Sequence, residues 1–470
     1  MTTTTADSAK LSFKEKSGYA LGDTASNLFW MTFVFFGSFF YTDVFGIRPE
    51  QMATLFFVTR IIDTVFDPIV GMVADRTTTR WGKFRPYLLW FVVPFGVCGA
   101  LAFITPPFGG AGKLVYAYIT YGLIGLVYSA INLPYSALMG VISPSSEERT
   151  KVSSFRFVGA YSAGLVVSLC TLPLVKLFGG GNQQLGFAIT VGLYASVGMV
   201  MWVVCFATTK ERVVPKAENS SFVRDLGDVV TNVPWLILFV LGIATLSYVS
   251  IRNGCFAYYF KYYVGDQTVL GMRFSANGML GAFFVAGSLA TLLGTSLVAP
   301  IAKRIGKRQL YMIMMAIASV LTVAFYFLGP EDVVLMFVLQ ILANLIMGPT
   351  AALVYAMYAD ASDYSEWKTG RRSTGLVFAA SSFAQKMGWT VGGAVTGLIL
   401  STFGYEAGKV QSAGSLTGLK LLVSFIPAAG SIIAAFLPLL YSLDDKRMQQ
   451  IERELAERRA NGETAAAAPA

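Results

Sequence analysis

Two acidic side chains lie one helical turn apart inside a long apolar run of the sequence. Asp63 and Asp67 follow Arg60 at intervals of three and seven residues, so a helix would carry all three on one narrow face. Hard cations prefer oxygen ligands, and a buried carboxylate beside a like charge can instead carry a proton. The pattern predicts a site for Na+ or H+. The alternative for Arg60 and Asp63 is that they only tie helices together.

Polar and aromatic side chains recur at helical spacing in three further apolar runs. The three stripes are Asp23, Asn27 and Trp30; Tyr128 and Asn132; and Ser382, Lys386 and Trp389. Polar side chains in such stripes could bind sugar hydroxyls, and an indole could stack on an apolar sugar face, although core packing is the simpler role for Trp30. Arg252 is a further charge inside an apolar run, and it would either hold an acid or bind an anionic substrate.

The composition requires these stripes to lie in a membrane. Hydrophobic residues make up 55% of the 470 residues, and charged residues only 13%, about half the share of an ordinary soluble domain. The sequence holds no His, which excludes His ligands and His-dependent catalysis, and its four Cys lie in apolar runs typical of core positions. The apolar runs are long and unbroken, which predicts an all-α membrane protein rather than a β-barrel.

Twelve apolar runs are long enough to cross a bilayer as helices. They lie near 19–45, 51–74, 86–105, 114–141, 156–178, 186–208, 233–263, 275–301, 309–328, 333–358, 375–403 and 418–442. Of the 36 Lys and Arg residues, 26 fall in the two tails and the loops on the same side as them, and seven fall in the opposite loops. The positive-inside rule then predicts that both termini are cytoplasmic, and it explains the net charge of +9 without nucleic acid as a partner.

Two motifs occur twice at nearly the same offset. R-x-G-K stands at 80–83 and again at 304–307, and S-E-x-(K/R)-T stands at 146–150 and again at 365–369. The duplication predicts two parallel six-helix halves, an arrangement that places a substrate near the midplane between them. Asp63 and Asp67 correspond to Gly287 and Thr291, so cation chemistry belongs to the N-terminal half. The predicted segments are an N-terminal stretch 1–17, bundles 18–208 and 233–443, a linker 209–232 with a short amphipathic helix, and a tail 444–470 that starts as a charged helix.

Four motifs together resemble a known family. They are Y-T-D-V-F-G at 41–46, R-I-I-D-T-V-F-D-P-I-V-G at 60–71, R-W-G-K-F-R-P at 80–86 and A-D-A-S-D-Y at 359–364. The chain resembles the glycoside–pentoside–hexuronide cation symporters of the major facilitator superfamily, the family of the melibiose carrier. The likeness covers nearly the whole chain and implies that superfamily's fold of twelve transmembrane helices in two six-helix bundles.

The resemblance also implies roles for individual residues. Asp63 and Asp67 match the family's cation-binding acids, and Ser129 is a possible further ligand. The positions that line or support the sugar site are Asn27, Asn132, Arg156, Ser382 and Lys386, and Tyr128 borders both sites. From the stripes and the buried charges we add Asp23, Trp30, Arg252 and Trp389 as candidates for substrate binding.

Three departures from the melibiose carrier bear on specificity. Asn27 and Asn132 are neutral amides where that carrier has aspartates, so galactoside specificity does not carry over. Phe66 replaces a polar Asn, which removes an oxygen ligand and favours H+ slightly over Na+. With Arg156 and other cations present, an acidic substrate such as a uronide is a second hypothesis.

The function expected from the resemblance is cation-coupled (H+ or Na+) symport of a glycoside, pentoside or hexuronide into the cell by alternating access. The expected partners are the sugar, the cation and the bilayer, with no other cofactor, in a multi-pass monomer of the bacterial inner membrane. One alternative is symport of a lysolipid or another amphiphile. The other is an intramembrane enzyme, against which the lack of His and of a nucleophile motif argues.

Overall fold

The computed structural model describes residues 10–143, 145–212, 231–269, 271–369 and 374–460. Each of the twelve predicted runs lies on a helical segment within these ranges. Eight helices of the described part are long and apolar enough to cross a membrane, judged by length and composition alone. The predicted amphipathic helix at Ser220–Phe222 falls outside the described residues.

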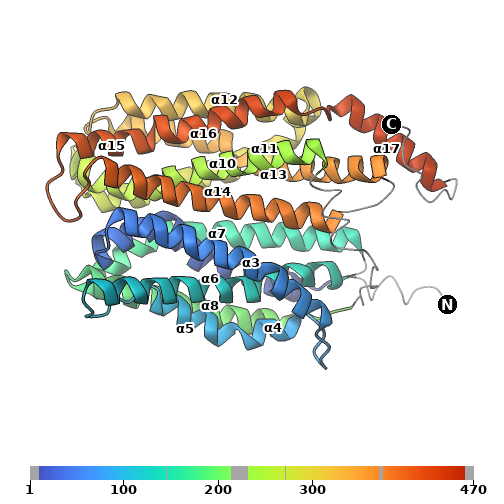
Figure 1. The fold of residues 1–470 in the computed structure, drawn as a ribbon, viewed down its shortest axis with the longest axis horizontal. Helices are drawn as coiled ribbons and strands as arrows, with labels where there is room; N and C mark the ends of the chain where they lie inside the picture. Colours follow the sequence, from blue (N-terminus) through green and yellow to red (C-terminus); the bar gives the residue numbers. More distant parts are fainter. Residues whose placement is uncertain (1–9, 144, 213–230, 270, 370–373, 461–470) are drawn as a thin grey trace. The chain divides into compact units, whose positions relative to one another are not determined.

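The first of two compact units comprises Met1–Ala217 with Ser275–Val285 and Leu400–Ser412. The two short segments lie beyond the N-terminal bundle predicted from sequence. Within this unit the ring of Phe284 stacks on Phe35 at 4.3 Å, and the Tyr405 hydroxyl donates to Asp43 at 2.6 Å. The helices are α2 (Phe13–Thr32), with π-helices η1 (Phe33–Gly37) and η2 (Phe40–Phe45), α3 (Pro49–Arg76), α4 (Arg85–Trp90), α5 (Val92–Leu101), α6 (Gly110–Val141), α7 (Ser146–Gly179) and α8 (Gln183–Thr208) (Figure 1).

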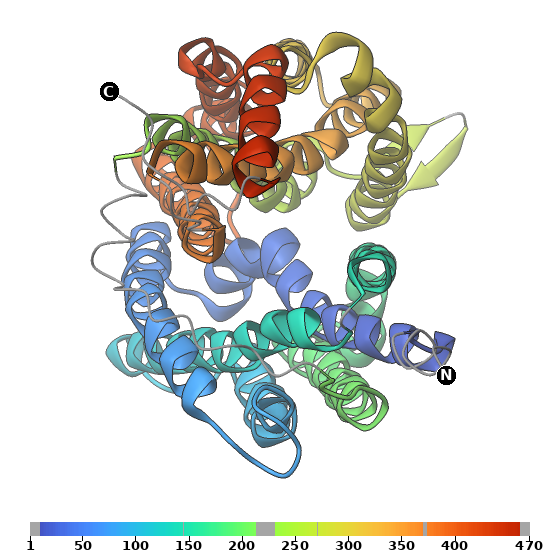
Figure 2. The ribbon, with the colours of Figure 1, turned by 90° about the vertical axis from the view of Figure 1, so that its right-hand side faces the viewer.

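The second unit comprises Glu218–Phe274, Ala286–Ile399 and Ala413–Ala470. Its elements include a small β-hairpin that the sequence analysis did not predict and that stands out from the helices (Figure 2). They are α10 (Val233–Tyr258), η3 (Tyr259–Val264), β1 (Gln267–Val269), β2 (Met272–Phe274), α11 (Ala276–Ile305, whose first turns belong to the first unit), α12 (Lys307–Ala324), η4 (Phe325–Phe327), α13 (Val333–Thr369), α14 (Thr374–Thr402), α15 (Ala413–Val423), α16 (Phe425–Phe436), η5 (Leu437–Leu440) and α17 (Asp445–Ala460).

Small residues and paired tyrosines set the spacing of α2 in the first unit. A Cβ at Gly22 would lie 2.7 Å from the ring of Tyr135 on α6, so α2 can approach this closely only with glycine there. Tyr19 and Tyr135 each donate a hydroxyl hydrogen bond to the other's backbone carbonyl, at 2.8 and 2.7 Å, and their rings stack at 4.4 Å. These reciprocal bonds fix the register of α2 against α6, two of the three helices that carry the candidate site.

Charged residues gather at one end of the first unit. Glu148, at the start of α7, pairs with Lys16 at 2.7 Å and with Lys151 at 3.0 Å, and these bonds lower its pKa to about 2. Glu211 accepts the backbone N–H groups of residues 83, 84 and 85, and so caps the start of α4. Arg212 pairs with Glu15 of α2. Since one end of the bundle collects the start of α2 and the ends of α6 and α8, the helices alternate in direction as the predicted spans require.

The predicted charged tail forms α17, and one face of it is buried. Met448, Ile451 and Leu455 belong to the hydrophobic core of the second unit. The Trp367 indole, at the end of α13, donates to Glu454, and Arg458 donates to the Trp367 carbonyl at 3.0 Å. The tail helix is therefore an integral part of the second unit. Glu463–Ala470, predicted to be disordered, fall outside the described residues.

Candidate functional site

Asp63 is the centre of a buried polar cluster on α3. Its side chain is 4% exposed, and its two oxygens have different partners. Arg60 Nη1 lies 3.0 Å from Oδ2, and Ser129 Oγ on α6 donates to Oδ1 at 2.7 Å. The i, i+3 spacing predicted from the sequence thus forms a real ion pair, and Ser129 lies where a third ligand was expected.

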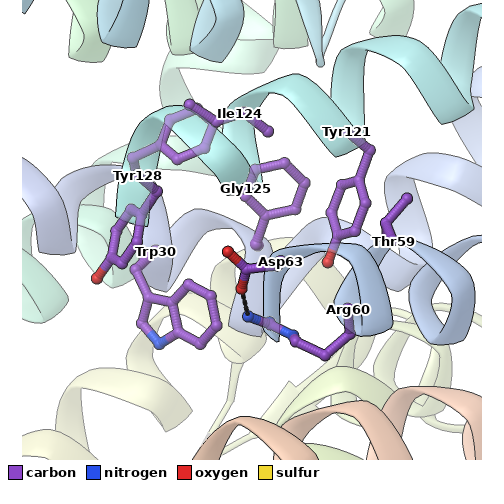
Figure 3. Close-up of a pocket in the computed structure, with 10 residues that line it drawn as sticks. Trp30, Thr59, Arg60, Asp63, Tyr121, Ile124, Gly125 and Tyr128 are labelled. Atoms are coloured by element: carbon purple, nitrogen blue, oxygen red, sulfur yellow. Dashed lines mark hydrogen bonds and ion pairs between the residues drawn. The ribbon is translucent and has the colours of Figure 1, made fainter. Parts of the chain in front are cut away.

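A cavity with aromatic walls surrounds this cluster (Figure 3). Trp30 comes from α2, while Tyr121 and Tyr128 come from α6 (Figure 3). The guanidinium carbon of Arg60 lies 5.4 Å from the Trp30 ring centre, within the range of a cation–π interaction. Lining residues are Phe29, Trp30, Phe33, Thr59, Arg60, Asp63, Tyr121, Ile124, Gly125 and Tyr128. The cavity combines an ion pair with flat apolar faces, a combination suited to a small cation beside a sugar ring.

Asp67 lies one turn further along α3 and is half-buried. One of its carboxylate oxygens, Oδ1, is inaccessible to solvent. Among the described residues, no group of three or more His, Cys, Asp and Glu could hold a metal ion. A cation at this place would therefore be a weakly held monovalent ion or a proton, with carboxylate and hydroxyl oxygens as its ligands.

A second ion pair lies on the polar stripe of α2. Arg156 of α7 donates from Nε to Asp23 Oδ2 at 2.9 Å, and its guanidinium carbon lies 5.3 Å from the Tyr135 ring centre. The Asp23 side chain is 11% exposed and that of Arg156 is 25% exposed, so the pair is only partly shielded from solvent. Both of these predicted substrate residues are brought together, each neutralised by the other.

The two amides on this stripe are held by hydrogen bonds within the first unit. Asn132 accepts the Ser26 hydroxyl at 2.8 Å and donates to the Tyr128 carbonyl at 3.0 Å, while Asn27 donates to the Asp23 carbonyl at 2.9 Å. The Trp30 and Tyr128 rings lie 5.7 Å apart. Because these two rings also line the cavity around Asp63, the polar stripes of α2 and α6 are continuous with the cation cluster.

The four remaining candidates lie in the second unit. Arg252 is 5% exposed, and its guanidinium carbon lies 4.9 Å from Phe325 and 5.2 Å from Phe256. Its Nε and Nη2 atoms have no hydrogen-bond partner among the described residues. Three further candidates on α14 differ in burial: Ser382 is exposed, and Lys386 and Trp389 are half-buried. The contacts of Arg252 thus join α10 to the end of α12, apart from the α14 stripe.

Several lining residues were missed from the sequence. Tyr121 stands seven residues before Tyr128, two turns away on the same face of α6, so helical periodicity could have identified it. Gly125 could not have been found in this way. Its place beside Asp63, where a Cβ would lie 3.9 Å from the carboxyl carbon, depends on how α3 packs against α6.

Comparisons with known proteins agree with this geometry. Residues 18–445 match the family described as MFS/sugar transport protein. The chain is 37% identical to the putative glycoside/cation symporter YagG of Escherichia coli (strain K12), over 96% of each chain. It is 34% identical to the inner membrane symporter YicJ of the same strain, over 95% of each chain. It is 35% identical to the isoprimeverose transporter of Lactiplantibacillus pentosus, over 95% of this chain and 93% of the relative.

The fold also has a counterpart among solved structures. The crystal structure of the nucleoside transporter NupG aligns with a TM-score of 0.63, covering 92% of this chain and 100% of that chain. The two sequences are only 13% identical, so the likeness concerns the fold alone.

Proposed function

The chain belongs to the MFS/sugar transport protein family, and from that premise we propose which of its residues bind the coupling cation and the sugar. Its function is cation-coupled sugar symport, and the resemblance to the glycoside–pentoside–hexuronide symporters is confirmed. The all-α major facilitator fold is confirmed as well. The family and the relatives are transporters of sugars and related solutes, so neither the lysolipid alternative nor the enzyme alternative is retained.

In the proposed cation site, Asp63 and Asp67 supply carboxylate oxygens and Ser129 a hydroxyl oxygen. The observation that carries this proposal is the buried Asp63 carboxylate held between Arg60 at 3.0 Å and Ser129 at 2.7 Å. A charge buried in a membrane helix is costly, and it is typical of ion pathways. The coupling ion is H+ or Na+, and the apolar side chain of Phe66 between the two acids favours H+.

The proposed sugar site follows the stripe of α2, α6 and α7. Its members in the first unit are Asp23, Asn27, Trp30, Tyr128, Asn132 and Arg156, and those in the second unit are Arg252, Ser382, Lys386 and Trp389. Arg156 and Arg60 are each paired with a carboxylate of the first unit. This pairing favours a neutral glycoside or pentoside over an acidic sugar, since an acidic group would have to displace a carboxylate from its arginine.

In the proposed mechanism, cation binding at Asp63 and Asp67 raises the affinity for sugar, and the two halves then alternate in access. We further propose a monomer in a bacterial inner membrane with both termini in the cytoplasm. Its partners are the sugar, the cation and lipid, with no nucleic acid.

Uptake into membrane vesicles tests the proposal. Vesicles carrying the protein are given an inward gradient of H+ or of Na+, and a panel of neutral and acidic glycosides and pentosides is offered to each. We expect one gradient to drive uptake of a neutral sugar, and Asp67→Asn to abolish the gradient dependence while sugar exchange continues. Gradient-driven uptake that survives in both Asp63→Asn and Asp67→Asn would refute the cation site. A preference for acidic sugars would refute the neutral substrate.

A further inference from the structure

The second unit repeats part of the helix pair that holds the cation cluster. The motif I-x-x-P-x-x-A-L stands at Ile131–Leu138 in α6 and at Ile346–Leu353 in α13, 215 residues apart. The R-x-G-K loops that follow α3 and end α11 relate those two helices at an offset of 224 residues. Duplicated halves therefore give each residue of the cation cluster a counterpart in the second unit.

Applying these offsets pairs four positions across the duplication. The pairs are Asp63 with Gly287, Asp67 with Thr291, Gly125 with Gln340, and Ser129 with Asn344. The acids are replaced by glycine and threonine, while a glycine and a serine are replaced by larger amides. Polar atoms have thus moved from the first helix of the pair to the second.

The four counterparts adjoin one another in the second unit. A Cβ at Gly287 would lie 3.0 Å from Gln340 Nε2 and 3.1 Å from Asn344 Nδ2, so the two amides occupy the space that a side chain there would need. The Thr291 hydroxyl donates to Asn344 Oδ1 at 3.4 Å, and Asn344 Nδ2 donates to the Gln340 carbonyl at 2.9 Å. In the first unit, Asp63 likewise adjoins Ser129 and Gly125.

Gln340 is the member of this cluster that calls for a ligand. Its side chain is 2% exposed, and Oε1 has no hydrogen-bond partner among the described residues. A buried acceptor left without a donor costs about 1–3 kcal/mol, so such a group normally meets one. None of the four counterparts carries a charge, and a cation would find no carboxylate among them. A neutral O–H donor fits this set of amide and hydroxyl groups.

We propose that Gln340 and Asn344 bind a hydroxyl group of the transported sugar, with Thr291 orienting the Asn344 amide. The second unit then supplies a sugar contact at the place where the first unit supplies the cation site. It follows that the duplication leaves the chain with one cation site rather than two. The inference rests on sugar transport and deepens the proposed sugar site.

The test combines substitution with sugar analogues. Gln340→Met keeps the length of the side chain and removes its amide. Binding of a sugar that the wild-type protein accumulates is measured by titration calorimetry on purified protein, for the parent sugar and for each monodeoxy analogue. We expect Gln340→Met to weaken the parent sugar about 3- to 10-fold, the loss typical of one neutral hydrogen bond. One deoxy analogue should lose the same factor on the wild-type protein and no more on the variant.

Two controls separate this role from a structural one. Ser319→Ala removes a buried hydroxyl pair with Ser431 in the same unit, at 2.7 Å, and should lower thermal stability without changing sugar affinity. Thr291→Val is a second, nearly isosteric variant, for use where Gln340→Met does not fold, and should weaken sugar about 2- to 3-fold. Unchanged sugar affinity in both variants, or equal losses for every deoxy analogue as a trapped water would give, overturns the proposal. Failure of the proposed cation site would appear separately, in the cation dependence of binding.

Discussion

Replacement of Arg60 by glutamine should tighten binding of the coupling cation. In the structure the Asp63 carboxylate is already neutralised by Arg60, at 3.0 Å, with side-chain exposures of 13% for the arginine and 6% for the acid. A cation that binds Asp63 must therefore displace the guanidinium. In Arg60→Gln that competitor is absent, and an external cation meets a carboxylate that still has its Ser129 hydrogen bond.

The size of the effect follows from the geometry. Two unit charges 3.0 Å apart attract by about 5 kcal/mol at the effective dielectric constant of about 20 that suits protein sites. Displacement does not cost all of this, because the guanidinium regains hydration and lies within cation–π range of Trp30, which is worth about 0.5–2 kcal/mol. A remainder of about 1–3 kcal/mol corresponds to a cation affinity about 5- to 150-fold higher in the variant.

The assay is a titration of purified protein with Na+, and separately with H+, read by sugar binding. Arg60→Lys retains a positive charge and should shift the cation affinity much less. Arg156→Gln removes the arginine paired with Asp23 and should leave it nearly unchanged, since Arg156 does not contact Asp63. A weaker or unaltered cation affinity in Arg60→Gln, with sugar binding intact, would refute the competition between arginine and cation.

Three further predictions concern other parts of the chain. Asp67→Asn should lower gradient-driven sugar uptake at least tenfold and leave exchange of labelled for unlabelled sugar within about twofold, measured in the same vesicles. Because Lys16 and Lys151 hold the pKa of Glu148 at about 2, below its ordinary value of 4.5, its contribution to stability is complete above pH 4.5 and is lost as the pH falls toward 2; thermal unfolding of Glu148→Gln should therefore depend less on pH across this window. Trp367→Phe removes the indole hydrogen bond to Glu454 and should make α17 open about fivefold more often, about 1 kcal/mol, seen as faster hydrogen exchange confined to that helix.

Most of the fold follows from hydropathy, because a bilayer forces apolar runs of about 20 residues into helices. Two features do not follow from it. The β1–β2 hairpin was expected to be a loop, since its strands of three residues are too short to show a pattern against polar neighbours. The buried face of α17 was also missed: Met448, Ile451 and Leu455 recur at helical spacing, but a mean over so charged a segment conceals them.

The site was predictable wherever one helix carries both partners. The spacing of Arg60 and Asp63 was sufficient to predict their ion pair, because residues three apart are neighbours on a helix. The pair of Asp23 with Arg156 joins residues 133 positions apart, and it depends on how closely α2 packs against α7. No sequence spacing determines that approach; glycines such as Gly159, whose Cβ would lie 2.8 Å from the Ala20 carbonyl, permit it.

The arrangement of these contacts suggests why the two ligands of a symporter would depend on each other. Arg60 touches Asp63 on one side and Trp30 on the other, and Trp30 in turn lies beside Tyr128. If a cation takes the carboxylate, the guanidinium must move, and the rings that would face the sugar must then repack, since interiors this dense do not deform continuously. Coupling in this scheme needs no long pathway, because one arginine is shared by the proposed cation and sugar sites. It also requires the coupling to be reciprocal, so that sugar binding tightens the cation by the same factor by which the cation tightens the sugar.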